Sequence, residues 1–577
     1  MEKVITLPQG KNEDISIVVT GAAGQGIQTV EDILGKVLKR SGLNVFATKE
    51  YMSRVRGGNN STEIRVSSKS VRAFVNRIDL LICLNKGLRN YLKERISNDT
   101  VIIGDIEEMG KELAGRGQMF FDVPLLHFAK ELGSPLFANV VAAGIITSLF
   151  DVDMSLLEQY FDERFGAKDK GLVTKNIDAA KKGYEIAREL AEDITVKMDH
   201  NSEIGKELLL TGSDAVALGA IAGGCNMIFG YPMSPATGVL SHLSQVAEEF
   251  GIVTEQTEDE ISAMNMAIGG WYAGGRAMVT TSGGGFDLMS EGLSLVGIGE
   301  SPMVIHLGQR PGPATGLATR TEQADLNLAL YAGHGEFPRA ILAPGSIQDA
   351  FYMTQHAFNL AARYQVPVFI LTDQYLLDSS YNLPAFSCEG LKVEKHIVKT
   401  DESYKRYVIT EDGVSPRGIP GYGNGLIAFD SNEHGETGRN MDEDPQIRSE
   451  MNAKRMRKLK GLEEDSLPPA LYGDVDYDVL LIGWGSTKHI IEEAMEKFSR
   501  PKTAFLQIRQ PFPLHSSTKD YLKRAKVIVD IEGNATAQMA NLIKLLTGIE
   551  ASHRILTSSG MEITVEELLI KLRCLHI

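Results

Sequence analysis

Cysteine is scarce in this sequence, with four residues in 577: Cys83, Cys225, Cys388 and Cys574. No two of them are close enough along the chain to make the short ligand spacings of a zinc site or an iron–sulfur cluster. They also form no disulfide framework, which is typical of a protein kept in a reducing compartment. We therefore expect no metal in this chain and a cytoplasmic location.

Signal, membrane-spanning and basic segments are also missing. Residues 1–21 lack the basic and apolar segments of a signal peptide. The longest apolar stretch, Phe137–Phe150, is too short to span a bilayer. Acidic residues outnumber basic ones by 75 to 59, for a net charge of −16. This balance disfavours nucleic acid and anionic membranes as main partners.

Hydrophobic residues make up 43% of the chain, which also contains 57 glycines. Residues 1–195 begin with a strand-like run, a glycine turn and a helical stretch, after which strand-like and helical segments alternate. The same alternation returns in residues 205–465 and in residues 466–577. Because alternating strands and helices form mostly parallel sheets with helices on both faces, we predict three α/β domains with these bounds.

Residues 379–465 interrupt this alternation. They are rich in glycine, proline and charge and include the basic run "AKRMRKLK" (Ala453–Lys460). We predict a long irregular connection with short strands. A connection of this length is usually functional or forms an interface.

The turn "GAAGQG" (Gly21–Gly26) lies between a strand and a helix, where free backbone N–H groups favour an anion. Its spacing differs from the G-x-G-x-x-G fingerprint of dinucleotide sites. The turn therefore indicates either a phosphate-bearing ligand or simply a tight connection. Downstream, Arg54 and Arg56 adjoin two glycines and either hold a second phosphate or form a solvated loop.

Glu260 has two interpretations. Thr257-x-x-Glu260 matches a capping box, in which both side chains satisfy the first helical N–H groups. Alternatively, Glu260 is buried at the helix start and hydrogen-bonds a cofactor ring nitrogen. The helix that follows has small residues that favour close packing of a partner backbone, as at an obligate interface: Ala263, Ala267, Gly269, Gly270 and Ala273.

Three further turns follow strand-like runs. In "FGYPMSPATG" (Phe229–Gly238), two prolines restrict the turn that presents Ser234 and Thr237 as hydroxyl donors. The successive glycines of "TTSGGGFDLMSEGL" (Thr280–Leu293) let a planar or phosphorylated ligand approach the backbone. The turn "GNATAQ" (Gly533–Gln538) resembles the same device.

The stretch "LGQRPGPATGLATRTEQADL" (Leu307–Leu326) follows the apolar run "MVIHL". It combines arginines and threonines with prolines and glycines at a strand end. Such polar residues in a restricted loop indicate a site for a small negatively charged ligand.

Taken in order, these stretches resemble the α subunit of 2-oxoacid:ferredoxin oxidoreductases with a γ domain fused ahead of it, over nearly the whole chain. Within that family the resemblance is closest to the 2-oxoglutarate synthase type. It implies a thiamine diphosphate pyrimidine-type domain in the centre and a transketolase C-terminal-like domain at the end. The implied reaction is the oxidative decarboxylation of a 2-oxo acid, with an acyl-CoA as product and electrons passed to ferredoxin.

The resemblance also implies roles for single residues. Glu260 corresponds to the carboxylate that hydrogen-bonds N1′ of the aminopyrimidine ring, and the resemblance favours this role over capping. Arg310 corresponds to the arginine that binds the substrate carboxylate, which suits a guanidinium fork. Ser234 stands where the family commonly has threonine in a YPITP motif. Thr315 is a further donor for the substrate.

The γ portion is expected to close over coenzyme A, with Gly24, Gln25, Gly26 and Arg56 as its contacts. Arg320 is a candidate for a second substrate carboxylate or for a structural pair with Glu322, and we favour the pair.

No "GDG" element, which thiamine diphosphate enzymes use to hold Mg²⁺ and the diphosphate, occurs in the sequence. We therefore expect a separate β subunit to carry that site and a 4Fe–4S cluster, in an (αβ)₂-type assembly, and the chain alone to be inactive. The same absence argues against a stand-alone enzyme of transketolase type. A pyruvate or branched-chain 2-oxo acid enzyme stays open, as does a nucleotide-binding regulatory subunit that uses "GAAGQG".

Overall fold

The structure is a computed structural model that describes residues 5–6, 14–22, 26–52, 58–85, 87–107, 109, 119–190, 194–439 and 443–575. The chain forms two compact units, which we describe separately. The first unit comprises Met1–Leu210 and Ser379–Phe386, and the second comprises Thr211–Asp378 and Ser387–Ile577. The three-domain division at residues 195, 205 and 465 stays a prediction.

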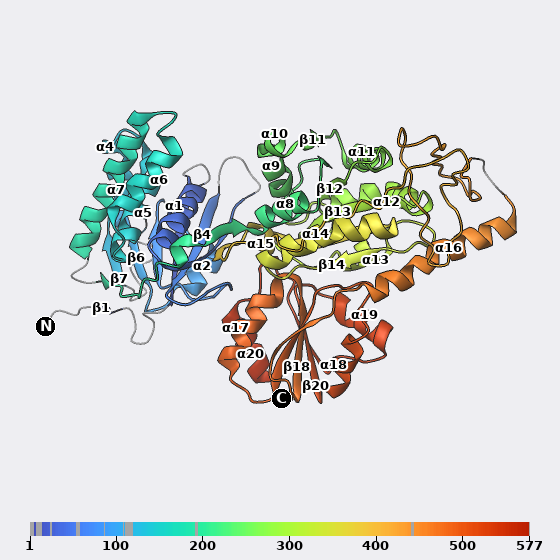
Figure 1. Ribbon diagram of the computed structural model, residues 1–577. Coiled ribbons are helices and arrows are strands. Elements are labelled where there is room, and N and C mark those ends of the chain that lie inside the picture. Colours follow the sequence, from blue (N-terminus) through green and yellow to red (C-terminus); the bar gives the residue numbers. More distant parts are fainter. Residues whose placement is uncertain are drawn as a thin grey trace. The chain divides into compact units, whose positions relative to one another are not determined.

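The first unit is built on an eight-stranded sheet (Figure 1) with the order β7-β6-β5-β2-β4-β3-β16-β9. Its strands are β2 (Asp14–Ala22), β3 (Asn44–Glu50), β4 (Asn59–Ser67), β5 (Leu80–Cys83), β6 (Val101–Gly104), β7 (Met119–Asp122), β9 (Leu208–Thr211) and β16 (Ser380–Leu383). A separate parallel pair joins β1 (Ile5–Thr6) to β8 (Ile194–Thr195).

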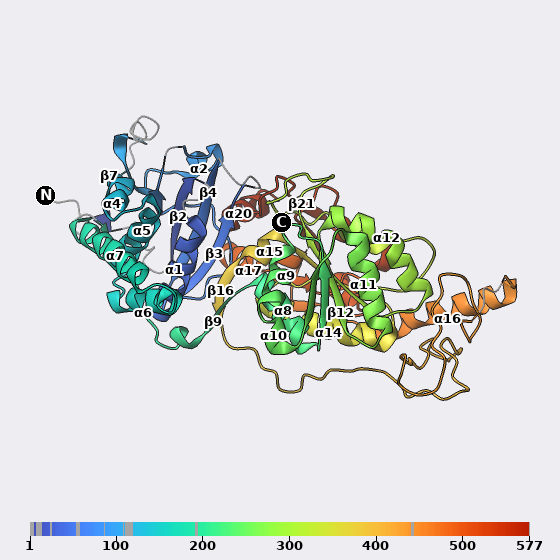
Figure 2. The same ribbon diagram turned by 90° about the horizontal axis from the view of Figure 1, so that it is seen from above.

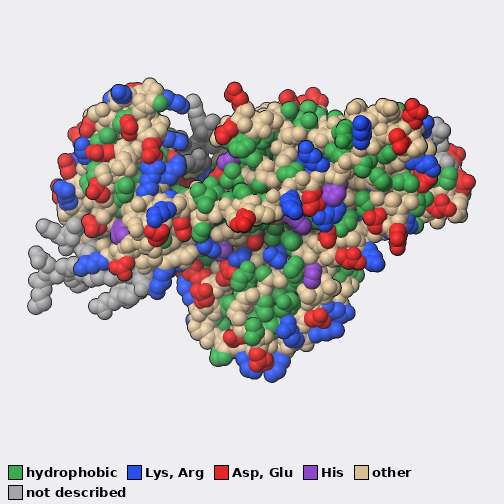
Figure 3. All heavy atoms as spheres, viewed as in Figure 1, with side chains coloured by type: hydrophobic (Ala, Val, Ile, Leu, Met, Phe, Trp, Pro, Cys, Tyr) green, Lys and Arg blue, Asp and Glu red, His purple; other side chains and the backbone are tan. Residues whose placement is uncertain are grey.

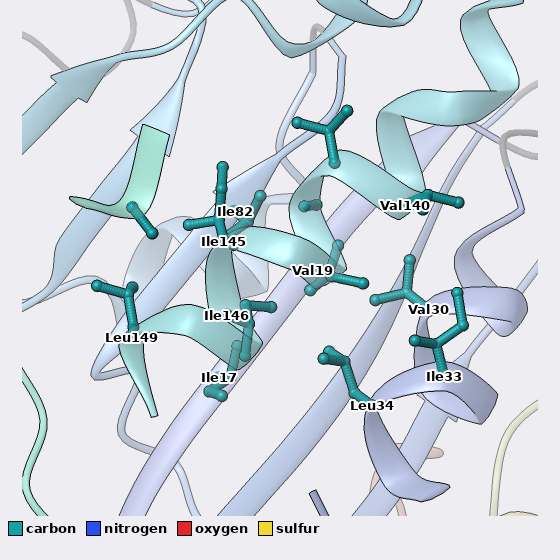
Figure 4. Close-up of a cluster of buried hydrophobic side chains, with 14 of the residues drawn as sticks. Ile17, Val19, Val30, Ile33, Leu34, Ile82, Val140, Ile145, Ile146 and Leu149 are labelled. Atoms are coloured by element: carbon teal, nitrogen blue, oxygen red, sulfur yellow. The ribbon is translucent and has the colours of Figure 1, made fainter. Parts of the chain in front are cut away.

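Helix α2 (Asn90–Arg95) packs on one face of this sheet, and the opposite face is covered by α1 (Ile27–Arg40), α4 (Leu125–Glu131), α5 (Ala138–Leu149), α6 (Met154–Phe165) and α7 (Lys170–Leu190). Figure 4 shows the larger core, where side chains of α1 and α5 meet those of β2 and β5. The apolar stretch Phe137–Phe150 is thus mostly helix α5, and it is buried. Helices α5 and α7 pack closely because Gly144 and Gly183 each face the backbone of the other helix.

The first sheet is less parallel than we predicted. Strand β4 pairs antiparallel with both β2 and β3, and β16 pairs antiparallel with β3. Strand β4 begins at Asn59, directly after the two glycines that follow Arg56. Only a short connection separates β3 from β4, so no crossover helix can make this pair parallel.

The second unit contains a six-stranded parallel sheet of order β11-β10-β12-β13-β15-β14. Its strands are β10 (Met227–Gly230), β11 (Val253–Gln256), β12 (Ala277–Thr281), β13 (Met303–Gln309), β14 (Ala340–Leu342) and β15 (Pro367–Asp373). Figure 2 shows α11 (Glu260–Tyr272) and α12 (Gly283–Ile298) on one face and α8 (Gly212–Ala222) and α9 (Thr237–Gln245) on the other. The remaining helices are α10 (Ala247–Phe250), α13 (Leu326–Tyr331), α14 (Ile347–Tyr364), which packs on α8, and α15 (Gln374–Asp378).

A five-stranded sheet completes the second unit, in the order β17-β19-β18-β20-β21, with only β17 antiparallel. Its strands are β17 (Ala470–Gly473), β18 (Val479–Trp484), β19 (Thr503–Ile508), β20 (Val527–Glu532) and β21 (His553–Leu556). Figure 1 shows α17 (Lys488–Phe498) and α20 (Val565–Cys574) on one side and α18 (Thr518–Arg524) and α19 (Gln538–Thr547) on the other.

Helix α16 (Pro445–Glu464) contradicts the irregular structure predicted for the end of residues 379–465. Asp444 caps it by accepting a hydrogen bond from Gln446 N at 2.8 Å. Its buried positions recur at helical spacing, but three of the five are basic: Met451, Lys454, Arg455, Lys458 and Leu462. A search for apolar periodicity misses this helix because charged side chains occupy its buried face.

A buried ion triad holds α16 against Glu300, which lies two residues after the end of α12 in this unit. Glu300 contacts Lys454 Nζ at 2.7 Å and Lys458 Nζ at 2.6 Å, and all three side chains are at most 1% exposed. Burial alone would raise the pKa of Glu300, but the two ammonium groups hold it down at about 2. Glu300 is therefore ionised at neutral pH.

We expect Glu300→Gln to lower the free energy of unfolding by about 3–5 kcal/mol, because it leaves two buried ammonium groups without a counter-charge. The matched control is Glu464→Gln, which breaks the exposed pair with Lys460 at 3.9 Å and should change stability little. Urea unfolding followed by circular dichroism compares the two variants. Equal stability would contradict the importance of the triad.

The surface carries both signs of charge. Acidic and basic side chains are interspersed over both units on the face shown in Figure 3. Among the described helices, none is both long and apolar enough to cross a membrane.

Candidate active site

Glu260 is the first residue of α11, and it does not cap that helix. The N-cap is Asp259, whose Oδ1 accepts a hydrogen bond from Ser262 N at 2.7 Å. Thr257 Oγ1 instead donates to the Asp259 carbonyl at 2.8 Å. The capping-box interpretation of Thr257 and Glu260 is therefore wrong, because the helix begins later than the motif suggests.

The Glu260 side chain is 3% exposed, and its Oε1 has no hydrogen-bond partner. It lies against Gly285 in the first turn of α12, where a Cβ atom would collide with Oε1 and with Thr281 Oγ1. Burial is the largest influence on the Glu260 carboxyl and raises its pKa, and the Asp259 charge raises it further. An unpartnered buried carboxyl is costly unless a ligand satisfies it.

Two more polar atoms without a hydrogen-bond partner adjoin the same turn. Ser282, the N-cap of α12, makes no side-chain capping bond, and its Oγ is buried. Asp325 Oδ2 is also buried and unpartnered, and a Cβ at Gly283 would lie 2.5 Å from it. The turn Gly283–Gly285 is thus flanked by three oxygens that no described protein group satisfies.

Arg310 directly follows β13. Its Nη1 donates a hydrogen bond to the carbonyl of Ser234 at 2.7 Å. Ser234 is half-buried in the turn between β10 and α9, and Thr315 is exposed in the loop that follows Arg310. Burial lowers the pKa of Arg310, and the nearby Asp325 raises it. The structure therefore brings Arg310 and Ser234 together, whereas their roles toward a ligand stay predictions.

The loop after Arg310 is hydrogen-bonded to residues at the strand ends of the five-stranded sheet of the same unit. Gln323 Nε2 donates to the Trp484 carbonyl at 2.8 Å, and Gln323 Oε1 accepts from Gly533 N at 2.8 Å. Asn534 Nδ2 donates to the Gln323 carbonyl at 3.1 Å. The "GNATAQ" turn therefore holds a protein loop, in contrast to the ligand-binding device that we predicted.

The backbone N–H groups at the start of α19, which follows this turn, are also hydrogen-bonded within the protein. Glu532 Oε2 accepts from Met539 N and Oε1 from Ala540 N, both at 3.0 Å. These bonds satisfy the N–H groups that an anion would need.

Part of the predicted coenzyme A site lies outside the described residues, namely Gly24, Gln25 and Arg56. Gly26 is described, and it precedes α1 with φ of 74°, a left-handed conformation that favours glycine. Its carbonyl accepts a hydrogen bond from Asn139 Nδ2 at 3.3 Å. The coenzyme A contacts thus stay a prediction.

Comparisons with known proteins identify the family. A model described as "Pyruvate flavodoxin/ferredoxin oxidoreductase, thiamine diP-bdg" matches residues 218–454, and "Pyruvate ferredoxin/flavodoxin oxidoreductase" matches residues 16–186. The α subunit of a 2-oxoacid:ferredoxin oxidoreductase from Sulfolobus sp is 33% identical over 96% of both chains. The chain belongs to the α subunits of 2-oxoacid:ferredoxin oxidoreductases.

A solved 2-oxoglutarate:ferredoxin oxidoreductase from Magnetococcus marinus, with 2-oxoglutarate, coenzyme A and succinyl-CoA bound, is 30% identical. The match covers 97% of this chain and 99% of that one, with a TM-score of 0.90. The 2-oxoglutarate synthase subunit KorA of Archaeoglobus fulgidus is 30% identical over 57% of this chain and 88% of its own. These matches confirm the predicted family and the α/β fold with a thiamine diphosphate-binding domain. They remove the basis for a nucleotide-binding regulatory subunit.

Asp325 and Gly285 are functional candidates that no sequence motif distinguishes. Asp325 lies within the quoted stretch Leu307–Leu326, but nothing in its sequence context distinguishes it from the acidic residue Glu322 nearby. Gly285 is one of three successive glycines. Only the folded chain shows which carboxylates face this turn.

We expect Gly285→Ala to reduce the activity of a 2-oxoacid:ferredoxin oxidoreductase complex about 100-fold, because displacement of a catalytic group by an ångström has effects of this size. Gly284→Ala is the matched control, since a Cβ there meets only the Ala314 carbonyl, at 3.8 Å. Both changes favour the helix, but only Gly285→Ala brings a Cβ against the buried Thr281 Oγ1, so its melting temperature should be the lower of the two. Equal dye-reduction rates for the two variants would contradict the contact with Glu260.

Proposed function

We propose that the chain works with a separate β subunit in the coenzyme A-dependent oxidative decarboxylation of 2-oxoglutarate to succinyl-CoA, with electrons passed to ferredoxin. The observation that carries this proposal is the buried Oε1 of Glu260, which has no hydrogen-bond partner. Asp325 faces the same turn, and its backbone N donates to Gln309, the residue before Arg310. A buried carboxyl without a partner fits a cofactor ring nitrogen.

Glu260 would hold thiamine diphosphate through its Oε1, by a hydrogen bond to N1′ of the aminopyrimidine ring. When bound, this cofactor supplies a nucleophilic carbon and an electron sink for the loss of carbon dioxide. The raised pKa of Glu260 suits the role, because burial favours the protonated carboxyl, which can donate a hydrogen bond to the ring nitrogen. Gly285 contributes by leaving room for that carboxyl.

Arg310 would bind the 1-carboxylate of the 2-oxo acid, since a guanidinium matches a carboxylate with two parallel hydrogen bonds. Its bond to the Ser234 carbonyl fixes one side of the guanidinium. Ser234 and Thr315 would add hydroxyl donors to the substrate. Arg320 Nη1 donates to the Thr319 carbonyl at 3.1 Å, and Arg320 stays a candidate for a distal substrate carboxylate or for a pair with Glu322.

The outer face of α11 and α12 is our candidate surface for the β subunit. It exposes Ile261, Met266, Tyr272 and Leu288, which are 38–50% exposed. Our expectation for the small residues of α11 needs correction, because Ala263, Ala267 and Gly270 are buried within this chain and only Gly269 and Ala273 are exposed. The β subunit would supply the Mg²⁺ and diphosphate site and a 4Fe–4S cluster in an (αβ)₂-type assembly. A cytoplasmic location stays a prediction.

The test is an anaerobic assay of the complex isolated through a tag on this chain. Coenzyme A-dependent reduction of a viologen dye is compared with 2-oxoglutarate, pyruvate and 2-oxoisovalerate as substrates. We expect the highest kcat/KM with 2-oxoglutarate and co-purification of a β subunit that carries iron and thiamine diphosphate. A higher kcat/KM with pyruvate or a branched-chain acid would keep the mechanism and replace the substrate.

Pyruvate is the second candidate substrate, because both matching family models are named for pyruvate enzymes. Isolation of the tagged chain alone, without iron or thiamine diphosphate, would contradict the proposed assembly.

A further inference from the structure

Asp325 is a carboxylate of the candidate site to which the proposed function gives no role. Its backbone N donates a hydrogen bond to Gln309 Oε1 at 3.0 Å, and Gln309 immediately precedes Arg310. Its Oδ2 is buried without a hydrogen-bond partner, against the turn that also faces Glu260. Asp325 is therefore fixed by its main chain while its side chain is left unbonded.

A structural role does not account for this side chain. Asp325 precedes α13, but it makes no side-chain capping bond to that short helix. Within the described parts of the chain, no lysine or arginine lies within 4.0 Å of its carboxylate. An unpartnered buried oxygen destabilises the fold, so its retention points to a role toward a ligand.

Charged groups from three elements act on this carboxyl. Burial is the largest influence, and together with the charges of Asp287 on α12 and Glu322 in the same loop it raises the pKa of Asp325 to about 7. Arg310 acts in the opposite direction. Glu260 of α11 faces the same turn of α12 and is itself an acid with a raised pKa.

We propose that Asp325 is a positioning residue that controls binding of the 2-oxo acid through Arg310. In its neutral form it leaves the guanidinium to the carboxylate of the substrate. In its ionised form it attracts the guanidinium and repels that carboxylate. This inference rests on the proposed role of Arg310 in substrate binding.

The direction of the pH effect follows from the neutral and ionised forms. Below pH 7 Asp325 is mostly neutral and the substrate binds well, whereas above pH 7 it is mostly ionised and binding weakens. The 2-oxo acid stays ionised throughout this range, since carboxylic acids next to a carbonyl are strong acids. Substrate binding therefore favours the protonated form of Asp325 and takes up a proton from solvent.

The experiment measures KM for 2-oxoglutarate and kcat of the purified complex between about pH 6 and pH 8.5 at saturating coenzyme A. For the unmodified enzyme we expect KM to rise about fivefold from pH 7 to pH 8, as one ionisation requires, with little change in kcat. Asp325→Asn should keep the low-pH KM across the range. The control Asp287→Asn makes the same charge change on an exposed side chain of α12 and should retain the rise, shifted to lower pH because the Asp287 charge raises the pKa of Asp325.

Asp325→Ser provides a second variant if the asparagine variant melts at a lower temperature than the unmodified complex. A rise of KM that persists in both Asp325 variants would overturn the proposal, as would a fall in kcat at saturating substrate with an unchanged KM profile. Arg310→Ala separates the two proposals. If the Arg310→Ala variant still uses the 2-oxo acid normally, the assignment of Arg310 fails. If that variant loses use of the 2-oxo acid but KM still rises with pH in the Asp325 variants, only the Asp325 inference is refuted.

Discussion

Glu260→Gln is expected to lower kcat of the complex by about 100- to 10,000-fold, the usual contribution of a positioned acid–base group. The amide has nearly the shape of the carboxyl and would fit the space beside Gly285. It cannot, however, gain and lose a proton at the position of Oε1. Because that oxygen has no protein partner, the substitution breaks no hydrogen bond there. We therefore expect the melting temperature to stay close to that of the unmodified protein.

Glu258→Gln is the matched control for this prediction, since Glu258 lies two residues earlier and is exposed. Its activity should match that of the unmodified complex. Rates come from the coenzyme A-dependent dye assay, and bound thiamine diphosphate is quantified separately. A Glu260→Gln complex that melts earlier yet turns over normally would show that Glu260 is only structural.

Arg310→Ala is expected to reduce kcat/KM for the 2-oxo acid by about 30- to 5,000-fold. This range corresponds to the roughly 2–5 kcal/mol lost when one partner of a buried charge-assisted pair is removed. Arg310→Lys should be intermediate, because lysine keeps the charge but not the fork that matches a carboxylate. The loss should appear in binding of the 2-oxo acid, since the guanidinium is proposed to hold its carboxylate.

The KM for coenzyme A serves as the internal control and should be little changed in both Arg310 variants. Circular dichroism checks the fold, because the alanine variant also loses the bond to the Ser234 carbonyl. Unchanged kcat/KM for every 2-oxo acid tested would refute the substrate-binding role of Arg310.

The sequence alone predicted much of the fold and part of the site. Alternating strand-like and helical runs indicated the α/β class, because the chain forms most of these elements from local patterns of apolar residues and turns. The ordered motifs indicated the family across both units. Arg310 was placed correctly at the end of a strand, since an apolar run followed by proline and glycine marks such an end.

Other features were decided by contacts between distant parts of the chain. Strand β16 joins the first sheet through pairing of Ser380 with Ala47, which no local pattern shows. Helix α16 is stabilised by burial of Lys454 and Lys458 against Glu300, so its buried face does not look apolar. The turn Gly533–Gln538 resembled a ligand site because its partner, Gln323, is distant in sequence.

The same distinction holds within the candidate site. The residue type and the strand end of Arg310 determine what it can bind, and both can be read from the sequence. The unpartnered oxygens of Glu260 and Asp325 arise only because α11 and the loop before α13 both face the first turn of α12. A side chain's hydrogen-bond partners and desolvation depend on atoms brought near it by folding, so only the tertiary structure decides which carboxyls are left for a ligand.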